Sequence, residues 1–395
     1  MDKPLEGIRV LDLGHVLAMP TCTMQLADLG AEVIKIERSG KGDDSRNFGP
    51  FKNKESAYFI SINRNKKSIT LDLKKGKGKK IFKDLVKISD VVTENYRPNT
   101  MQKLGLGYED LKKINPKIIY ASISGFGHKS VYQERPGYDI IAQATGGIMG
   151  ITGQADGPPT RVGSSIGDIF SGTYATIGIL AALRVRDKSG LGQEVDISMM
   201  DAVLSVLENA VVRYTVTGEI PKRIGSGHPS IAPFDVFETK DGWVVIAIGN
   251  DSLWEKFCKV IDKVELLKDS HFSTNPKRSE NYRELKPIIE EWSREKTVEE
   301  ILNILIKSGV PVGEVNTIDK IVDDPNIKVR EMIVEVKHPQ AGKVKITNTP
   351  IKLSLTPGKV EKASPLLGQH TEEILNELLG FSKEEIDSLR REDVI

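Results

Sequence analysis

Short apolar runs recur along the first two hundred residues, and stretches with apolar residues at helical spacing separate most of them. The runs span residues 8–13, 32–37, 68–73, 90–94, 117–124 and 193–199, and the helical pattern covers 19–30, 77–89 and 108–114. Strands that alternate with helices are typical of parallel sheets joined by crossover connections. We therefore predict an α/β domain with a doubly wound sheet, covered by a loop over residues 47–62.

The pattern changes near Arg223. Two strand-like runs at 234–239 and 243–248 flank Lys240–Asp241–Gly242, which is a hairpin signal. Helical patterns follow at 252–262, 281–295 and 297–307, and residues 201–217 form one long apolar helical pattern. The predicted organisation is a large α/β domain beginning with residues 1–205, a linker helix at 206–223, a small α+β domain at 224–325, and a return segment at 326–395 that completes the large domain.

One acidic residue, Asp168, stands at the start of an apolar helix after a loop rich in Gly and Ser. The apolar positions at helical spacing predict the buried face of this helix, namely Ile169, Thr173, Thr176, Ile177, Leu180 and Leu183. Asp168 is either a helix N-cap or a nucleophilic carboxylate that the helix dipole keeps ionised. The stretch by itself leaves both interpretations open.

Composition narrows the class of protein. The 395 residues carry 56 Lys and Arg against 55 Asp and Glu, so the net charge of +1 predicts neither a nucleic acid nor a membrane partner. The two cysteines, Cys22 and Cys258, form no metal or disulfide pattern. The N-terminus lacks a secretory apolar region, and we expect no apolar run to reach the ~18 residues of a membrane span. We expect a cytoplasmic protein without a metal.

The turn after the first strand is a candidate binding site, because ligands of such sheets bind beyond the carboxyl ends of the strands. This turn holds His15, and Arg38 follows the second strand. The dinucleotide fingerprint GxGxxG is missing, which argues against an NAD enzyme. His15 is either a turn residue bonded to backbone or a ligand contact.

Several long segments, in this order, resemble the class III CoA-transferases. The segments are DLGHVLAMPTCTMQLADLGAEVIKIERSGKGDDSR, NRNKKSITLDL, TENYRPNTMQKLGLGYEDL, GYDIIAQATGG, the Asp168 stretch and PLLGQHTEEIL. That group includes formyl-CoA transferase and carnitine CoA-transferase and is related to α-methylacyl-CoA racemase. The resemblance implies an interlocked homodimer, a Rossmann-like large domain built from both termini, and no permanently bound cofactor.

The resemblance also implies a chemistry. The aspartate matching Asp168 attacks an acyl-CoA thioester, and the reaction passes through an aspartyl mixed anhydride and an aspartyl-CoA thioester before a carboxylic acid accepts the CoA. Backbone N–H groups at Gly225 and Gly227 are implied as donors to the oxyanion, although the loop is shorter than the four-glycine loop of formyl-CoA transferase. The segment GSGHPSIAPFDVFETKDG resembles transferases that use succinyl-CoA with dicarboxylic acceptors such as glutarate.

Matching positions imply the residues that bind CoA. Arg38 and Lys103 are expected at its phosphates, and Arg223 is a candidate for the distal carboxylate of a dicarboxylic acid. The remaining expected CoA-binding residues are His15, Leu17, Ala18, Leu71, Asn95, Tyr96, Arg97, Arg135 and Tyr138.

Two other functions remain open from the sequence. A racemase needs a base on each side of the reacting carbon, but the position where the racemase has histidine is Tyr138, which is a poor base at neutral pH. A non-catalytic CoA-binding protein would use the same basic residues without a covalent step.

Overall fold

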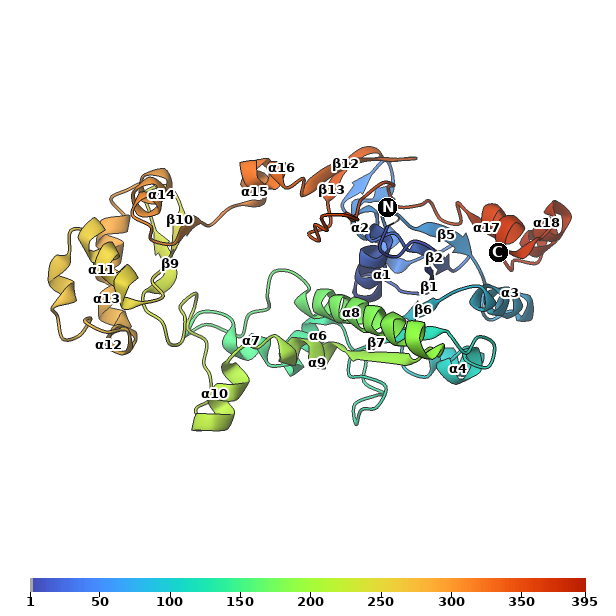
Figure 1. Cartoon of the computed structure of the whole chain (residues 1–395), viewed down its shortest axis with the longest axis horizontal. Coiled ribbons are helices and arrows are strands. Elements are labelled where there is room, and N and C mark those ends of the chain that lie inside the picture. The colour runs from blue at the N-terminus through green and yellow to red at the C-terminus, as the bar shows by residue number, and fades with distance from the viewer. Residues whose placement is uncertain (1–2) are drawn as a thin grey trace. The chain divides into compact units, whose positions relative to one another are not determined.

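A computed structural model describes residues 3–395 and resolves the chain into two compact units (Figure 1). The first contains the chain up to Ile148, then Val162–Val211 and Pro325–Ile395; the second contains Met149–Arg161 and Val212–Asp324. The division differs from the predicted one in placing Met149–Arg161 in the second unit. Each unit has its own apolar core.

The first unit is built on a six-stranded sheet in the order β5-β2-β1-β6-β7-β8, and every neighbouring pair is parallel. Its strands are β1 (Arg9–Asp12), β2 (Glu32–Glu37), β5 (Lys67–Thr70), β6 (Val91–Glu94), β7 (Ile119–Ser124) and β8 (Glu194–Ser198). The predicted α/β class with a parallel sheet is confirmed. The carboxyl ends of β1, β2 and β6 therefore meet at one edge.

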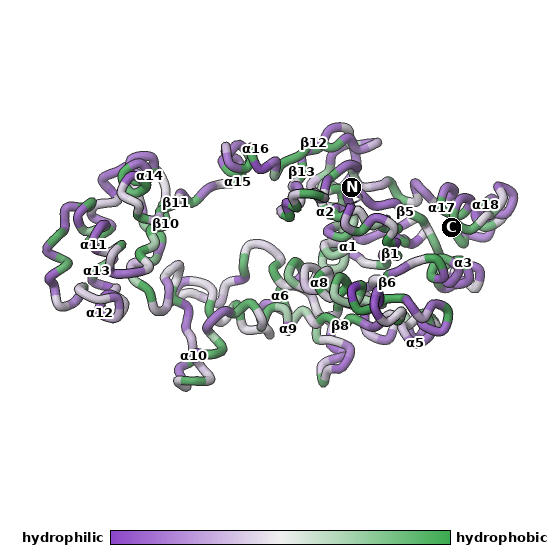
Figure 2. Tube along the Cα trace, in the orientation of Figure 1, coloured by the Kyte–Doolittle hydropathy of each residue, from purple (hydrophilic) through white to green (hydrophobic). Residues whose placement is uncertain are grey.

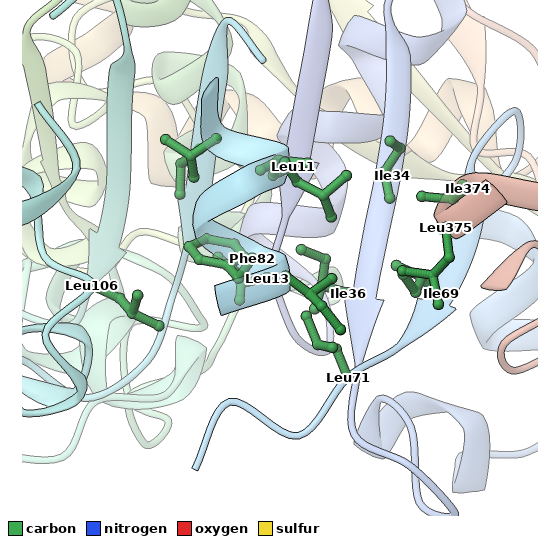
Figure 3. Packing of buried hydrophobic residues seen from close by; sticks show 14 of the residues in the cluster. Leu11, Leu13, Ile34, Ile36, Ile69, Leu71, Phe82, Leu106, Ile374 and Leu375 are labelled. Atoms are coloured by element: carbon green, nitrogen blue, oxygen red, sulfur yellow. The ribbon is translucent and has the colours of Figure 1, made fainter. Parts of the chain in front are cut away.

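Helices cover both faces of this sheet. Strand side chains alternate between the faces, and Leu11 and Leu13 face α3 (Gly76–Lys87), α17 (Thr371–Leu379) and α18 (Lys383–Arg391) in one continuous core (Figure 3). The apolar stripe of α3 among its lysines can be followed in Figure 2. The other face carries α1 (Ala18–Asp28) and α8 (Ile166–Ser189), which pack against each other.

The first unit completes this layer structure with shorter elements. Its further helices are η1 (Asp44–Asn47), α2 (Ala57–Ile62), α4 (Thr100–Leu104), α5 (Tyr108–Leu111), α6 (Asp139–Thr145), α9 (Met199–Ser205) and α16 (Pro325–Val329). Two hairpins, β3 (Phe51–Lys52) with β4 (Glu55–Ser56) and β12 (Ile333–His338) with β13 (Gly342–Thr347), are joined by hydrogen bonds between Asn53 and Gln340.

Two predictions for this unit were wrong. Residues 47–62 are not a plain loop, because they hold a hairpin and α2, whose N-cap Ser56 accepts a hydrogen bond from the Phe59 N–H. The long helix predicted at 201–217 breaks after Ser205, and Glu208 adopts a positive φ of 54° before α10 (Ala210–Thr217) begins. A left-handed residue of this kind cannot lie inside a regular α-helix.

The buried face of α8 also differs from the predicted one. Thr176 and Leu183 are buried as predicted, but Ile169 and Ile177 are exposed, and Ser171, Gly172 and Ala175 are buried in their place. Small side chains are needed there because α1 approaches closely: a Cβ on Gly172 would lie 2.5 Å from the carbonyl oxygen of Ala18. Contrary to the expectation from the sequence, α8 is long and apolar enough to cross a membrane, by length and composition only. It is the one helix among residues 3–395 that meets this test.

The second unit packs helices on a three-stranded antiparallel sheet, β11-β10-β9. The predicted hairpin is confirmed in β9 (Phe234–Glu238) and β10 (Trp243–Ala247), which β11 (Val312–Glu314) extends. The capping box of Thr297 and Glu300 is also confirmed, at the start of α14. The helices of this unit are α11 (Asp251–Val260), η2 (Val264–Leu267), α12 (Asn275–Glu280), α13 (Tyr282–Ser293), α14 (Val298–Lys307) and α15 (Ile318–Asp323); α7 (Ile148–Ile151) and α10 begin at its borders.

The close contact between α1 and α8 at Gly172 leads to a prediction about the free energy of unfolding. We expect Gly172→Ala to lower the free energy of unfolding by about 1–3 kcal/mol, because the new methyl group overlaps backbone that cannot yield easily. Gly76→Ala is the control, since nothing lies within 4 Å of its Cβ position, and Ala favours a helix over Gly. Denaturant unfolding of both variants measures the difference. Equal stability of the two variants would contradict the packing described here.

Candidate active site

The turn between β1 and α1 is held by buried charges. Lys35 Nζ lies 2.8 Å from Asp43 Oδ2 and donates a hydrogen bond of 2.6 Å to the Gly14 carbonyl, and Asp43 Oδ1 accepts from the Val16 N–H. Burial opposes ionisation of Asp43, but the Lys35 ammonium outweighs it and holds the pKa of Asp43 below its ordinary value. The pair keeps Val16 at a φ of 62°, which a β-branched residue rarely adopts.

The end of β6 is fastened to the same turn. The His15 N–H donates to Asn95 Oδ1 at 2.7 Å, and Asn95 Nδ2 donates back to the His15 carbonyl at 2.9 Å. The His15 ring lies against Tyr96, with Nε2 3.3 Å from its hydroxyl. Burial, assisted by the charge of Lys35, lowers the pKa of His15. The His15 side chain is therefore neutral at neutral pH. Its backbone is bonded to the Asn95 side chain, and its ring lies at the Tyr96 hydroxyl.

Asp168 is the third residue of α8, so the N-cap interpretation was wrong: Ser165 occupies the cap position. Asp139 of α6 caps the N-terminus of α8 instead, since its Oδ1 accepts a 2.8 Å hydrogen bond from the Gly167 N–H. Gln143 donates to the other oxygen of Asp139 and accepts from the Val162 N–H. These bonds fix the loop before α8 and leave the Asp168 carboxyl available.

The Asp168 carboxyl is half-buried, and its protonation differs from the expected one. Burial, followed by repulsion from the Asp139 carboxylate, raises the pKa of Asp168 to about 7. The helix N-terminus favours the anion, but loss of hydration outweighs it here. Asp168 therefore exchanges its proton near neutral pH, which is typical of a reacting group.

Asp168 lines a small cavity that shares a wall with a larger one. The small cavity has a volume of about 190 Å³ and the larger one about 640 Å³. Seven residues line both: His15, Asn95, Tyr96, Arg97, Pro136, Gly137 and Tyr138. The pair of cavities can hold a long ligand with its reactive end at Asp168.

The structure brings most of the predicted site residues to these cavities. The small cavity also contains Leu17, Ala18 and Arg135, and the larger one contains Arg38, Leu71 and Lys103. Gly225 and Gly227 belong to the second unit, where the Gly225 N–H donates to the Gly153 carbonyl. Arg223 lies in the same unit and donates to the Gly157 carbonyl.

Sequence reasoning missed three residues here. Lys74 lines the larger cavity, and its place directly after a predicted strand could have identified it. Burial, and next the Asp168 carboxylate, raises the pKa of Tyr58 to about 12, so this hydroxyl senses the charge of Asp168. Asp139 lies in the segment GYDIIAQATGG that resembles the family, but its bond to Gly167 depends on tertiary structure.

Among residues 3–395, no group of three His, Cys, Asp or Glu side chains could hold a metal ion.

Residues 5–371 match the family described as CoA-transferase family III. The chain belongs to this family. It is 40% identical over 394 residues to the succinyl-CoA:glutarate CoA-transferase of Homo sapiens, covering 100% of this chain and 90% of the relative. It is also 40% identical over 395 residues to the succinyl-CoA–D-citramalate CoA-transferase of Chloroflexus aurantiacus, covering 100% and 98%.

A solved structure agrees with this assignment. The crystal structure of a CAIB/BAIF family protein from Brucella suis is similar with a TM-score of 0.87 and 39% identity, over 96% of this chain and 100% of that one. This family III CoA-transferase is thus an enzyme that uses CoA thioesters as substrates. The larger cavity, with four basic residues in its lining, lies where an anionic ligand could be bound.

The raised pKa of Asp168 predicts a pH-dependent stability. Between its ordinary value of 3.8 and about 7, the folded state binds a proton that the unfolded state releases, so stability falls as pH rises through this range. We expect Asp168→Asn to gain stability over the wild type as pH rises from about 4 to about 7 and then to keep a constant gain. Denaturant unfolding across this range measures it, with Asp187→Asn at an exposed position of α8 as control. A gain that does not vary with pH would contradict the environment described for Asp168.

Proposed function

We propose that this enzyme transfers CoA from an acyl-CoA to a carboxylic acid through covalent intermediates on Asp168. The observation that carries the proposal is the position of Asp168 in a small cavity that shares seven wall residues with the larger one. A carboxylate nucleophile conserves the activated acyl bond, so the exchange needs no other energy source. No second carboxylate lines the small cavity among the described residues.

The first half of the reaction forms and consumes an anhydride. A carboxylate oxygen of Asp168 attacks the thioester carbonyl, the C–S bond breaks, and the CoA thiolate leaves. The thiolate then attacks the Asp168 carbonyl carbon, which releases the donor acid and leaves Asp168 as a CoA thioester. The half-buried carboxyl favours this sequence, because a poorly hydrated carboxylate is basic and an anhydride must be kept from water.

The second half reverses these steps with the acceptor. The acceptor carboxylate attacks the aspartyl thioester and expels the thiolate, which then attacks the acyl carbonyl of the acceptor–aspartyl anhydride. Acyl-CoA leaves, the Asp168 carboxylate is regenerated, and no proton is gained or lost. Each tetrahedral intermediate needs hydrogen-bond donors at its oxyanion. Because the Gly225 N–H already donates to the Gly153 carbonyl, we assign that role within the Gly225–Gly227 loop to the backbone N–H of Gly227.

The homodimer belongs to the same proposal. Three apolar side chains of α8, Ile169, Ile177 and Val185, are 38%, 55% and 50% exposed. Exposed apolar side chains that recur along one helix can be covered by a partner. We propose that a second copy of the chain covers them.

The relatives indicate which acids are exchanged. The names of the two relatives pair succinyl-CoA with glutarate and with D-citramalate, and all three acyl groups derive from short dicarboxylic acids. A cavity of about 190 Å³ at Asp168 suits short chains. We propose succinyl-CoA as the donor and a short dicarboxylate as the acceptor.

The central prediction concerns Asp168. We expect Asp168→Ala to lower the rate of CoA transfer by about a thousandfold or more, because no other group replaces the nucleophile. Acyl-CoA affinity should change little, since the larger cavity is unaltered. In the wild type, hydroxylamine added during turnover should convert Asp168 to a hydroxamate that mass spectrometry detects. Full transferase activity in the variant would overturn the mechanism.

The same preparation distinguishes the alternatives. A racemase would incorporate solvent deuterium next to the thioester carbonyl without any acceptor acid. A non-catalytic CoA-binding protein would give neither exchange nor an adduct on Asp168. The transferase requires an acceptor acid and forms the adduct.

A second prediction concerns the larger cavity, which we assign to the CoA phosphates through Arg38, Lys74, Arg97 and Lys103. We expect Lys103→Gln to raise the KM for acyl-CoA by roughly tenfold or more with little change in kcat, because a charge-assisted contact made equally in ground and transition states is lost. Lys87→Gln is the control, since this exposed lysine of α3 pairs with Asp84. A lower kcat with an unchanged KM would place Lys103 elsewhere.

A further inference from the structure

The proposed dicarboxylic substrates pose a question that the nucleophile alone does not answer. One carboxylate of the acid reacts at Asp168, so the other must be bound at a short distance by a cation. Asp168 and Asp139 make this region acidic, which increases the need for one. The following inference rests on the proposed function.

Among the described residues, Arg97 and Arg135 are the only Lys or Arg side chains that line the small cavity. Arg97 also lines the larger cavity, together with Arg38, Lys74 and Lys103. Arg135 lines the small cavity but not the larger one. Arg135 therefore lies at the small cavity, where the acyl group would be, and not at the larger cavity, where the nucleotide of CoA would be.

The guanidinium of Arg135 is held in place by aromatic rings. The central carbon of the guanidinium lies 3.9 Å from the centre of the Tyr132 ring, and the backbone N–H of Arg135 donates to the Tyr132 carbonyl at 2.9 Å. Tyr132 in turn packs edge-on against Phe126, with ring centres 5.6 Å apart. Because Phe126 is buried, the stack anchors an otherwise exposed side chain.

The loop that carries this stack is closed at its base. The backbones of Gly125 and Gly137 touch, since a Cβ on Gly137 would lie 2.6 Å from the Gly125 Cα. The Met200 N–H donates to the Gly125 carbonyl, and the Gly127 N–H donates to Ser124 Oγ. Arg135 is two residues from this closure, so its backbone is positioned by the end of β7.

The charge of Arg135 has no internal partner. Among residues 3–395, no carboxylate lies within ion-pair distance of it, whereas Arg38 pairs with Asp44 at 3.1 Å. A guanidinium stacked on an aromatic face keeps its N–H edge free, and that edge fits a carboxylate with two parallel hydrogen bonds. The small cavity that contains Asp168 therefore also contains an ordered guanidinium whose charge is not neutralised by a carboxylate.

We propose that Arg135 determines specificity by binding the distal carboxylate of the dicarboxylic acid, and that Tyr132 is the positioning residue for it. This replaces the role at CoA that the resemblance implied for Arg135. It also replaces Arg223, whose guanidinium already donates to the Gly157 carbonyl.

An internal competition tests the proposal. The enzyme receives succinyl-CoA with equal concentrations of glutarate and pentanoate, which differ by one terminal carboxylate, and mass spectrometry measures the ratio of glutaryl-CoA to pentanoyl-CoA. The ratio reports only the acceptor step, so a slower donor step does not affect it. We expect Arg135→Gln to lower the ratio by about tenfold or more, and Arg135→Lys to lower it less because the charge remains.

Matched variants separate the possible outcomes. Tyr132→Ala should lower the ratio and Tyr132→Phe should preserve it, because the ring and not the hydroxyl supports the guanidinium. Lys103→Gln should alter the KM for acyl-CoA without altering the ratio. An unchanged ratio in Arg135→Gln, with or without a higher KM for acyl-CoA, overturns the inference while leaving the transferase intact. If the wild type forms neither product and no adduct on Asp168, the proposed function itself has failed.

Discussion

The ion pair between Lys35 and Asp43 is the constraint on which the site depends. Both side chains are almost completely buried and lie 2.8 Å apart. Removing one partner from such a pair typically costs about 3–5 kcal/mol, because the other charge is left without water or a counter-ion. Through this pair the fold holds the Gly14 carbonyl and the Val16 N–H. A strained Val16 persists only where its surroundings fix it, so these buried charges set the path of the backbone that lines the Asp168 cavity.

Hydrogen bonds to Glu37 at the end of β2 show how residues 365–370, near the C-terminus, support the site. Arg46 binds both oxygens of Glu37 and donates to the Pro365 carbonyl, and Ser68 links Glu37 to the Gly368 N–H. The segment PLLGQH thus lies along β5, the edge strand of the sheet, where unpaired backbone groups would otherwise remain. His370 completes the pairing with Ser68. A segment far away in sequence therefore fixes the end of β2, which is part of the larger cavity's wall.

Periodicity predicted the parallel sheet, and the rule for the carboxyl ends of strands placed His15 and Arg38 at its rim; Asn95 was expected there only from the resemblance. Both depend on local patterns that tertiary contacts do not alter. The buried face of α8 could not be predicted, because close approach of α1 selects small residues over the larger Ile177. The hydrogen bonding around Asp168 could not be predicted either, since Asp139 from another helix accepts the bond that a cap at Asp168 would have accepted. Its raised pKa follows from burial, which a sequence pattern does not report.

Burial of Asp168 has opposite effects on the resting enzyme and on the proposed intermediate. An exposed carboxylate would ionise readily, but water would reach any acyl group attached to it. In the half-buried position the anion is disfavoured, and the Asp139 carboxylate disfavours it further. Acylation removes the charge of Asp168, so the anhydride and the thioester are relieved of both penalties. In the proposed mechanism, the site therefore destabilises the free nucleophile relative to its covalent states, which lowers the barrier to forming them without tightening the binding of substrate.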